Sequence, residues 1–282
     1  MNYKHLIPVT IAALILSCGN ATGQQPVTSS EKSDTFEYSE FSEKSGQSDV
    51  AAPSQASIPP AAQKIIDAYP DQHLTYADNH IVFPDGTKIL FDDGREKSFE
   101  VMLDDCDVED MLSMKYDPTE KVPAYLSDAG RTRCEAFFKK MYGENEAAVR
   151  RNLVRVNWFG QSLLFTKVNH ADEQLKKVAA DIAKVPELKK YMQQSSTFYW
   201  RPVRGAKRLS AHSYGMTIDI NTSYSNYWLW SNRGAGETTR GLKYENRIPE
   251  QIVEIFERHG FIWGGRWYHY DTMHFEYRPE YF

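Results

Sequence analysis

The chain has 282 residues, a formal net charge of −5 and 41% hydrophobic residues, which suits one globular domain with extensions. The slightly acidic balance implies no basic face, so we expect no nucleic-acid partner. Aromatic residues make up 13% of the chain, which is compatible with an aromatic core or with a cleft for sugars or peptides.

The N-terminus has the pattern of an export signal. A short cationic start precedes an apolar run over residues 6–16, which is too short to cross a bilayer as a helix. Residues 15–18 (ILSC) resemble the lipobox of bacterial lipoproteins, which implies lipid attachment to Cys18. We therefore expect residues 1–17 to be a signal peptide of the lipoprotein type, with an ordinary signal peptide as the alternative. The protein would then be an envelope lipoprotein facing the periplasm or the cell surface, and Gly19 favours the outer membrane in a Gram-negative cell.

The next segment, residues 18–60, is rich in Ser, Gln, Glu, Pro and Ala, and we expect it to be a disordered tether. A helix is predicted over residues 61–68. Residues 73–94 alternate apolar and polar side chains around a Pro-Asp-Gly turn, which predicts a β-hairpin. We assign residues 61–145 to an N-terminal region and residues 146–282 to the main domain.

The rest of the chain mixes helical and strand patterns. The predicted helices cover residues 128–142, 144–154, 170–183 and 248–259, and the predicted strands cover residues 216–220 and 274–279. There is no repeated βαβ unit, so an α+β fold with a small antiparallel sheet is expected.

Two short stretches hold a histidine close to an aspartate. His212 and Asp219 lie in LSAHSYGMTIDIN, and Asp271 and His274 lie in WYHYDTMHFEYRPE. A catalytic zinc ion takes three protein ligands, and imidazole and carboxylate groups are suitable. His212, Asp219 and His274 would supply them, which leaves Asp271 to act as a general base. Taken alone, either pair is a weak signal.

The two stretches together form the pattern SxHxxGxxxD followed by DxxHFE. The pattern consists of Ser210, His212, Gly215, Asp219, Asp271, His274, Phe275 and Glu276. It resembles the zinc D-alanyl-D-alanine carboxypeptidase family, which includes vancomycin-resistance D,D-peptidases and phage L-alanyl-D-glutamate endolysins and shares a fold with the hedgehog signalling domain. The resemblance covers residues 150–282, with the region from 61 expected to belong to the same unit. It implies a hedgehog/DD-peptidase-like fold with a small antiparallel sheet flanked by helices.

Carried onto this sequence, the resemblance implies one zinc ion bound by His212, Asp219 and His274, with Asp271 as the catalytic base. It also implies an upstream arginine that stabilises the oxyanion. Arg201 and Arg204 are the two candidates. We favour Arg201 because it directly follows the aromatic run TFYW.

Other residues have less certain roles. His269 precedes Asp271 by two positions and would bind substrate or support the site. Glu276 would hydrogen-bond a ligand residue, and Ser210 would stabilise the local turn or support the site. In an exported protein Cys106 and Cys134 can form a disulfide, and two free buried thiols are the alternative.

The resemblance implies a zinc metallopeptidase that hydrolyses stem peptides of peptidoglycan. We favour a D-alanyl-D-alanine carboxypeptidase. The alternatives are an L-Ala-D-Glu or cross-link endopeptidase of the same family, or a non-catalytic zinc-containing lipoprotein that binds the cell wall.

Overall fold

The computed structural model describes residues 57–282, which form one compact unit. The predicted signal peptide, Cys18 and the tether up to residue 56 lie outside the described residues. The helices are α1 Pro60–Ala68, α2 Phe99–Asp104, α3 Asp110–Ser113, α4 Glu135–Tyr142, α5 Glu146–Arg151, α6 Ala171–Ala183, α7 Trp228–Ser231 and α8 Glu250–Glu257. The strands are β1 Thr75–Ala77, β2 His80–Val82, β3 Lys88–Leu90, β4 Leu153–Trp158, β5 Gln161–Thr166, β6 Thr217–Asp219, β7 Phe261–Trp263 and β8 His274–Tyr277. None of the helices in this part of the chain is long and apolar enough to cross a membrane.

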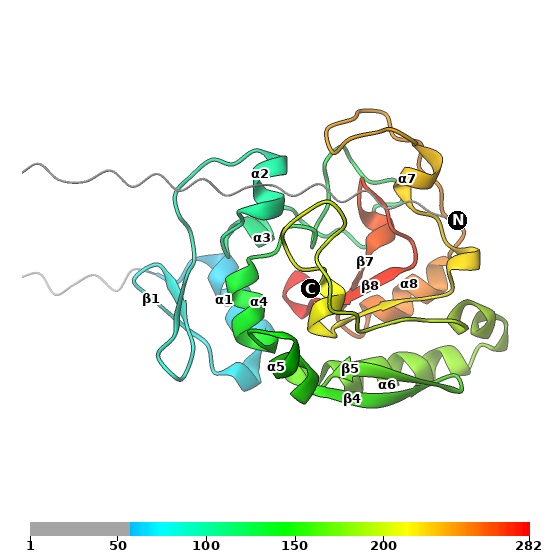
Figure 1. Cartoon of the computed structure of the whole chain (residues 1–282), viewed down its shortest axis with the longest axis horizontal. Helices are drawn as coiled ribbons and strands as arrows, with labels where there is room; N and C mark the ends of the chain where they lie inside the picture. The colour runs from blue at the N-terminus through cyan, green and yellow to red at the C-terminus, as the bar shows by residue number, and fades with distance from the viewer. Residues whose placement is uncertain (1–56) are drawn as a thin grey trace, which may run out of the picture. The chain divides into compact units, whose positions relative to one another are not determined.

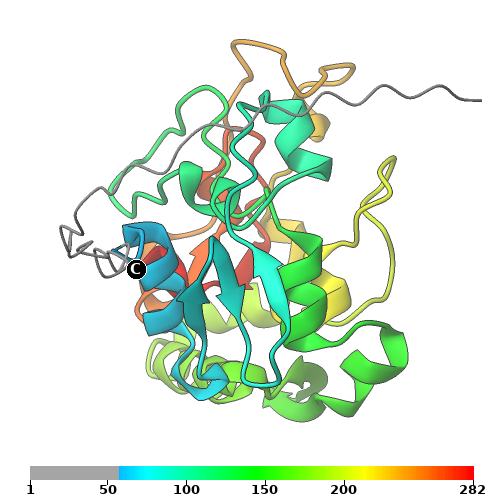
Figure 2. The ribbon, with the colours of Figure 1, turned by 90° about the vertical axis from the view of Figure 1, so that its left-hand side faces the viewer.

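The described residues confirm the α+β class, with three small antiparallel sheets (Figure 1). The predicted hairpin over residues 73–94 is a three-stranded sheet in the order β1-β2-β3, and Figure 2 shows it beside α1. Helix α1 packs against the turn Pro279–Tyr281 at the C-terminus, where the hydroxyl of Tyr69 donates to Glu280 at 2.5 Å. The N-terminal region therefore packs directly on the element that follows β8.

A second hairpin, β4–β5, replaces part of a predicted helix. Helix α5 spans Glu146–Arg151, so the helix predicted over residues 144–154 begins two residues too early and ends three residues too late. The alternating apolar residues of β4 and the two-residue turn Phe159-Gly160 favour a hairpin from this point. Helix α6, predicted over residues 170–183, packs on this hairpin with Leu175, Val178 and Ile182 buried.

The third sheet, in the order β6-β8-β7, positions the candidate site. Strand β8 pairs antiparallel with both neighbours, and the register places Asp219 of β6 directly opposite His274 of β8. Both strands were predicted from the sequence, whereas β7 was not. Residues directly opposite in an antiparallel pair have side chains on the same face, so the register alone brings these two side chains together.

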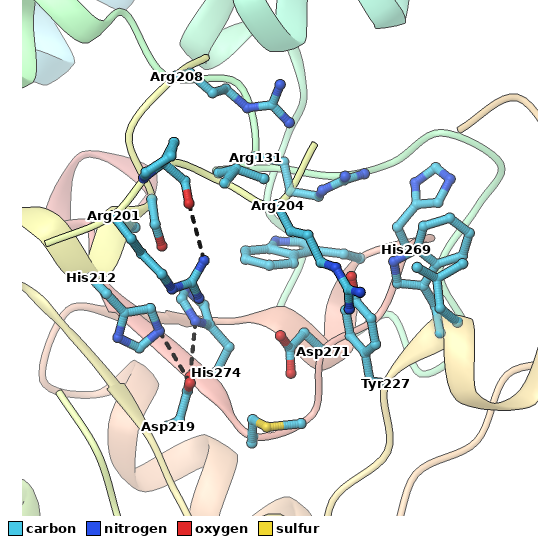
Figure 3. Close-up of a pocket in the computed structure, with 18 of the residues that line it drawn as sticks. Arg131, Arg201, Arg204, Arg208, His212, Asp219, Tyr227, His269, Asp271 and His274 are labelled. Carbon is cyan, nitrogen blue, oxygen red and sulfur yellow. Dashed lines mark hydrogen bonds and ion pairs between the residues drawn. The ribbon is translucent and has the colours of Figure 1, made fainter. Parts of the chain in front are cut away.

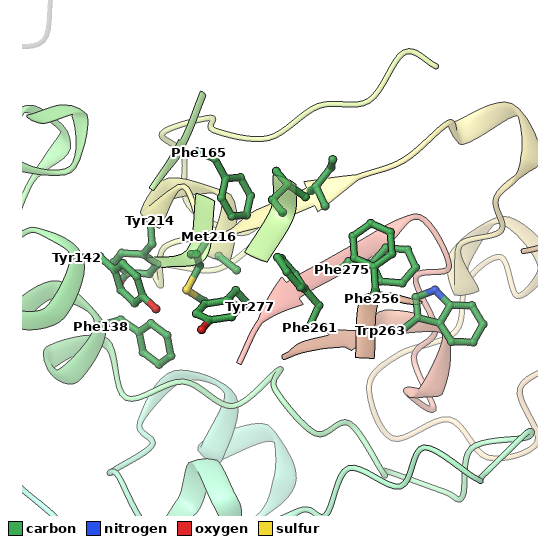
Figure 4. Close-up of a cluster of buried hydrophobic side chains, with 14 of the residues drawn as sticks. Phe138, Tyr142, Phe165, Tyr214, Met216, Phe256, Phe261, Trp263, Phe275 and Tyr277 are labelled. Atoms are coloured by element: carbon green, nitrogen blue, oxygen red, sulfur yellow. The ribbon is translucent and has the colours of Figure 1, made fainter. Parts of the chain in front are cut away.

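The core beneath this sheet is aromatic. The rings of Phe256 on α8 and Phe275 on β8 stack with centroids 3.9 Å apart, and the ring of Trp263 on β7 lies nearly parallel to Phe275 with centroids 6.2 Å apart (Figure 4). Phe275 alternates with His274 and Glu276 along the strand. Its burial against α8 therefore holds the opposite face of β8 toward the site.

The helix predicted over residues 128–142 is wrong in its first half. Only Glu135–Tyr142 is helical, and residues 128–134 form a buried loop. Gly130 has φ +98°, a conformation that an α-helix does not contain. The carboxylate of Asp128 accepts a hydrogen bond from the backbone N–H of His269 at 3.0 Å. A contact made 141 residues away along the chain therefore competes with local helix formation.

Cys106 and Cys134 are both free thiols in the structure, so the disulfide that export would permit is not formed there. Burial raises the pKa of both thiols above the usual range. The alternative expectation, two free thiols in the interior, agrees with the structure: Cys134 is buried and Cys106 is partly buried.

Candidate metal centre and active site

Three side chains from two neighbouring segments converge at one point. His212 lies in the turn Ala211–Tyr214 that leads into β6, and its Nε2 is 3.1 Å from Oδ2 of Asp219. The Nδ1 of His274 is 3.1 Å from the other oxygen, Oδ1, of the same carboxylate (Figure 3). The three ligand atoms all lie within 4.8 Å of one another. The structure thus brings together the three residues that the sequence predicts as metal ligands.

Each histidine is oriented by a partner on its outer nitrogen. The Nδ1–H of His212 donates to the backbone carbonyl of Thr197 at 2.6 Å, which leaves Nε2 free to bind a metal. The Nε2 of His274 lies 3.2 Å from Oε2 of Glu276, which leaves Nδ1 free. Such outer hydrogen bonds fix the tautomer and the direction of a metal-binding imidazole. Glu276 therefore contacts a predicted ligand residue, and its supporting role stays a prediction.

Glu276 is fully buried and is held by two arginines. Arg278 donates to its Oε1 at 2.9 Å, and Arg133 lies 3.8 Å from its Oε2. Burial raises the pKa of Glu276, but Arg133 and the hydrogen bond from His274 outweigh this and lower it to about 2. Glu276 is therefore ionised beside His274.

The carboxylates around His274 favour a positive charge at this point of the site. Burial alone lowers the pKa of His274, but the hydrogen bonds to Asp219 and Glu276 outweigh burial and raise it to about 10. Two imidazoles and a carboxylate in this arrangement are the donor set of a catalytic zinc site with an open position. The residues present therefore fit one zinc ion.

Asp271 lies beside this group without belonging to it. Its backbone N–H donates to the carbonyl of Gly264 at 2.9 Å, and its backbone forms a bridge with Tyr227. Its Oδ1 is buried and has no hydrogen-bond partner in the described part of the chain. Burial, followed by the nearby charge of Asp219, raises the pKa of Asp271 well above the ordinary range. A carboxylate with an unused lone pair and a raised pKa is suited to accept and return a proton.

Arg201 and Arg204 both line the pocket beside these residues, but their backbones are held by different contacts. The backbone N–H of Arg201 donates to Oγ of Ser213 at 3.0 Å, and its carbonyl accepts from Ser213 and Ser210. Arg204 lies in the turn between the bridged residues Pro202 and Leu209. Figure 3 shows the guanidinium of Arg201 near His274 and that of Arg204 near Tyr227. Arg201 therefore has a backbone anchored to the turn that carries His212, and the choice between the two arginines stays a prediction.

Ser210 stands at the start of the turn, and its side chain makes no capping hydrogen bond there, so its supporting role stays a prediction. It precedes the turn that carries His212, it is buried, and it lines the pocket. The hydroxyl that ties Arg201 to this turn, however, belongs to Ser213, which sequence reasoning did not single out.

The pocket has a volume of about 790 Å³ and extends well beyond the ligand residues. Aromatic side chains form much of its wall, among them Tyr227, Trp228 and Trp267. The pocket also contains His269, Arg131 and Glu237.

His269 is the centre of a second group of charged side chains. We call this group, composed of Asp128, Arg131, Glu237 and His269, the Asp128 cluster. The Nδ1–H of His269 donates to Oδ2 of Asp128 at 2.5 Å. Only His269 was considered from the sequence. The other three were missed because no local pattern marks them and their contacts span more than 100 residues of chain.

The other acidic clusters among the described residues surround a lysine side chain. Asp92, Asp93, Asp107, Glu109 and Asp110 form two clusters of metal-ligand type. The buried ammonium of Lys97 lies 2.9 Å from Asp93, 3.0 Å from Asp107 and 2.5 Å from Asp110. Lys97 therefore supplies an internal cation to three of these carboxylates, whereas the histidine-containing group has the donor set suited to catalytic zinc.

Comparison with known proteins gives one match. Residues 204–277 match the model of a family described as D-alanyl-D-alanine carboxypeptidase. No curated protein and no solved structure matches the chain. The matched segment contains His212, Asp219, Asp271 and His274. The match therefore confirms, for the part of the chain that holds the site, the resemblance to the D-alanyl-D-alanine carboxypeptidase family.

Proposed function

We propose that this protein is a zinc-dependent peptidoglycan peptidase and that it acts as a D-alanyl-D-alanine carboxypeptidase on stem peptides. The observation that carries the proposal is the convergence of His212, Asp219 and His274 beside Asp271, whose buried Oδ1 has no hydrogen-bond partner among residues 57–282. The family match of the same segment supports this assignment.

In this proposal His212, Asp219 and His274 hold the zinc ion. When bound, zinc polarises the substrate carbonyl and lowers the pKa of an attacking water. Asp271 takes the proton from that water and then returns it to the amine that leaves. Both transfers suit a carboxylate whose pKa burial has raised toward neutrality.

Arg201 stabilises the carbonyl oxygen as it gains negative charge. Among the described residues its side chain has no acidic partner, and its Nη1 contacts only the carbonyl of Pro202 at 3.3 Å. Its charge is therefore available to a substrate. Tyr227, whose backbone pairs with Asp271, and Trp228 form the adjoining wall.

Export is also part of the proposal. The apolar run over residues 6–16 and the lipobox-like ILSC support secretion and a lipid anchor at Cys18. This would place the enzyme in the envelope, where peptidoglycan lies.

The test is incubation of the zinc-loaded protein with purified muropeptides, with and without a chelator, followed by mass spectrometry. Loss of one alanine that the chelator abolishes is the expected result. Splitting of the stem or of a cross-link would instead assign an endopeptidase. Activity that resists the chelator but is blocked by a β-lactam would overturn the zinc mechanism.

A variant separates catalysis from binding. Asp271→Ala is expected to lose turnover and to retain zinc and wall binding, because Asp271 is not one of the ligand residues. The matched control is Asp67→Ala, which removes an exposed carboxylate from α1. A non-catalytic wall-binding protein would show no turnover in the wild type either.

A further inference from the structure

The Asp128 cluster forms an open ring of charged and polar side chains beside the proposed active site. Arg131 donates from Nη1 to Asp128 at 3.0 Å and to Oε2 of Glu237 at 2.9 Å, and from Nη2 to Oε1 of Glu237 at 2.9 Å. Asp128 in turn accepts from the backbone N–H and from Nδ1 of His269. The Nε2 of His269 lies 3.6 Å from Oε2 of Glu237, beyond hydrogen-bonding distance, and has no other partner in the described residues. Each member is therefore fixed by at least one other.

The members differ in their access to the pocket. The side chains of Asp128 and His269 are fully buried, and that of Arg131 is 15% exposed. The side chain of Glu237 is 32% exposed and lines the pocket. Glu237 is therefore the member of the ring that a ligand can reach most readily.

The loop that carries Glu237 is held in place. The hydroxyl of Tyr125 donates to the carbonyl of Thr238 at 3.0 Å, and the hydroxyl of Tyr268 donates to that of Thr239 at 2.8 Å. Together with the paired hydrogen bonds from Arg131, these contacts fix the carboxylate on the pocket wall. A carboxylate held in this way needs little further ordering when it binds a ligand.

The cluster holds two ionised carboxylates. Burial raises the pKa of both Asp128 and Glu237, but the contacts with Arg131 outweigh burial and hold both below their usual range. Two ionised carboxylates thus face one guanidinium, so the carboxylates of the cluster outnumber its arginine. Each oxygen of Glu237 has a lone pair that Arg131 does not use.

The pocket wall carries groups of both charges. Arg201 and Arg204 line it without an acidic partner among the described residues, whereas Glu237 supplies acceptors. In Figure 3 the metal-ligand residues lie on one side of Asp271 and His269 lies on the other. The indole of Trp228 packs edge-on against His269, with ring centroids 4.6 Å apart, and Trp230 offers an exposed aromatic surface in the same pocket. Carboxylate and aromatic faces together are suited to a cation.

We propose that Glu237, positioned by Arg131, Asp128 and His269, binds an ammonium group of the substrate peptide, such as the side-chain amine of a diamino acid. This inference rests on the proposed function, because it assigns a substrate group to a subsite of the same pocket. It adds a specificity determinant that lies within the matched segment but depends on Asp128 and Arg131 outside it.

The test compares two peptides that differ only in one amine. Nα-acetyl-L-Lys-D-Ala-D-Ala carries a free ammonium, and its Nα,Nε-diacetyl form does not. Binding to the zinc-loaded Asp271→Ala protein is measured by calorimetry, so that turnover does not interfere. Because charge-assisted hydrogen bonds are the stronger class, we expect the free amine to bind about tenfold more tightly. Equal affinities, or no binding of either peptide, would overturn the proposal.

A second variant tests the residue itself. Glu237→Gln, added to the Asp271→Ala protein, removes the charge of Glu237 at nearly constant shape. It is expected to abolish the preference for the free amine and to leave the affinity for the diacetyl peptide unchanged. Glu245→Gln is the matched control, because Glu245 bonds Ser231 and Asn226 of the neighbouring segment but does not line the pocket. Equal weakening of both peptides by Glu237→Gln would contradict the assignment. If that variant does not fold, Glu237→Asp, with the charge kept but the reach shortened, is expected to reduce the preference.

Hydrolysis by the wild-type protein is followed in parallel. Binding that prefers the amine without any hydrolysis would support the subsite and overturn the proposed catalysis. Hydrolysis of both peptides without any preference in binding would support the proposed catalysis and overturn the subsite. The two failures are therefore distinguishable.

Discussion

The Oε2 of Glu276 lies 3.2 Å from the Nε2 of His274, two residues away on the same face of β8. Because Glu276 is ionised and fully buried, it holds the imidazole with Nδ1 directed at Asp219. Glu276→Gln is therefore expected to weaken zinc binding by about 10–100-fold, the usual effect of removing such a partner. Competition with a chromophoric chelator measures the affinity.

Glu254→Gln, on the exposed face of α8, is the control and is expected to leave zinc affinity unchanged. Since Arg133 and Arg278 also depend on Glu276, the folded fraction of each variant must be checked by circular dichroism before titration. Unchanged zinc affinity in folded Glu276→Gln would show that Glu276 does not position His274.

The two candidate arginines give a paired prediction. Arg201 has a backbone anchored by Ser213 and a guanidinium near the ligand residues, whereas Arg204 lies in the adjoining turn. Arg201→Ala is expected to lower kcat by about 10²–10³-fold, as the loss of an oxyanion donor does. Arg204→Ala should leave kcat nearly unchanged. Steady-state kinetics on the muropeptide that the wild type cleaves would check both, and a larger effect on kcat from Arg204→Ala would reverse the assignment.

The ligand residues could be predicted from the sequence because their pattern is local and chemically specific. His212 and Asp219 lie on one turn and strand, and the strand pairing that joins Asp219 to His274 follows from two recognisable strand patterns. The prediction that a helix begins near residue 128 was wrong because the structure there depends on a contact that is distant in the sequence. Asp128 has its partner, His269, 141 residues away, and no periodicity in the sequence reports such a contact.

The Asp128 cluster also gives a prediction about stability. Asp128→Asn leaves Arg131 and His269 without their buried carboxylate, and breaking such a pair typically costs about 3–5 kcal/mol. Urea unfolding at pH 7 would measure the loss in free energy of unfolding. Asp67→Asn, which changes an exposed residue of α1, should leave that energy unchanged.

The stability difference between the wild type and Asp128→Asn is expected to depend on pH. The pKa of folded Asp128 lies below that of an unfolded aspartate, because Arg131 and His269 outweigh the effect of burial. Its ionised form therefore stabilises the protein above about pH 4, the unfolded pKa, and this contribution is lost as the pH falls through the lower folded value. The difference between wild type and Asp128→Asn should be largest near neutral pH and shrink below about pH 4. A difference that grows on acidification would contradict this account.

Gly264 lies against the backbone of Asp271, the proposed general base. A Cβ at Gly264 would lie 2.5 Å from the backbone oxygen of Asp271, and the Gly264 carbonyl accepts the N–H of Asp271. Gly264→Ala must therefore displace this turn, at a cost of about 1–3 kcal/mol for overpacking. Because a misplacement of about 1 Å can cost ~10²-fold in rate, kcat should fall by about 10–100-fold. Gly236→Ala is the control, because its Cβ would meet nothing within 4 Å. Thermal melts and kcat measured on both variants test the prediction, and wild-type activity in Gly264→Ala would show that the position of Asp271 tolerates this displacement.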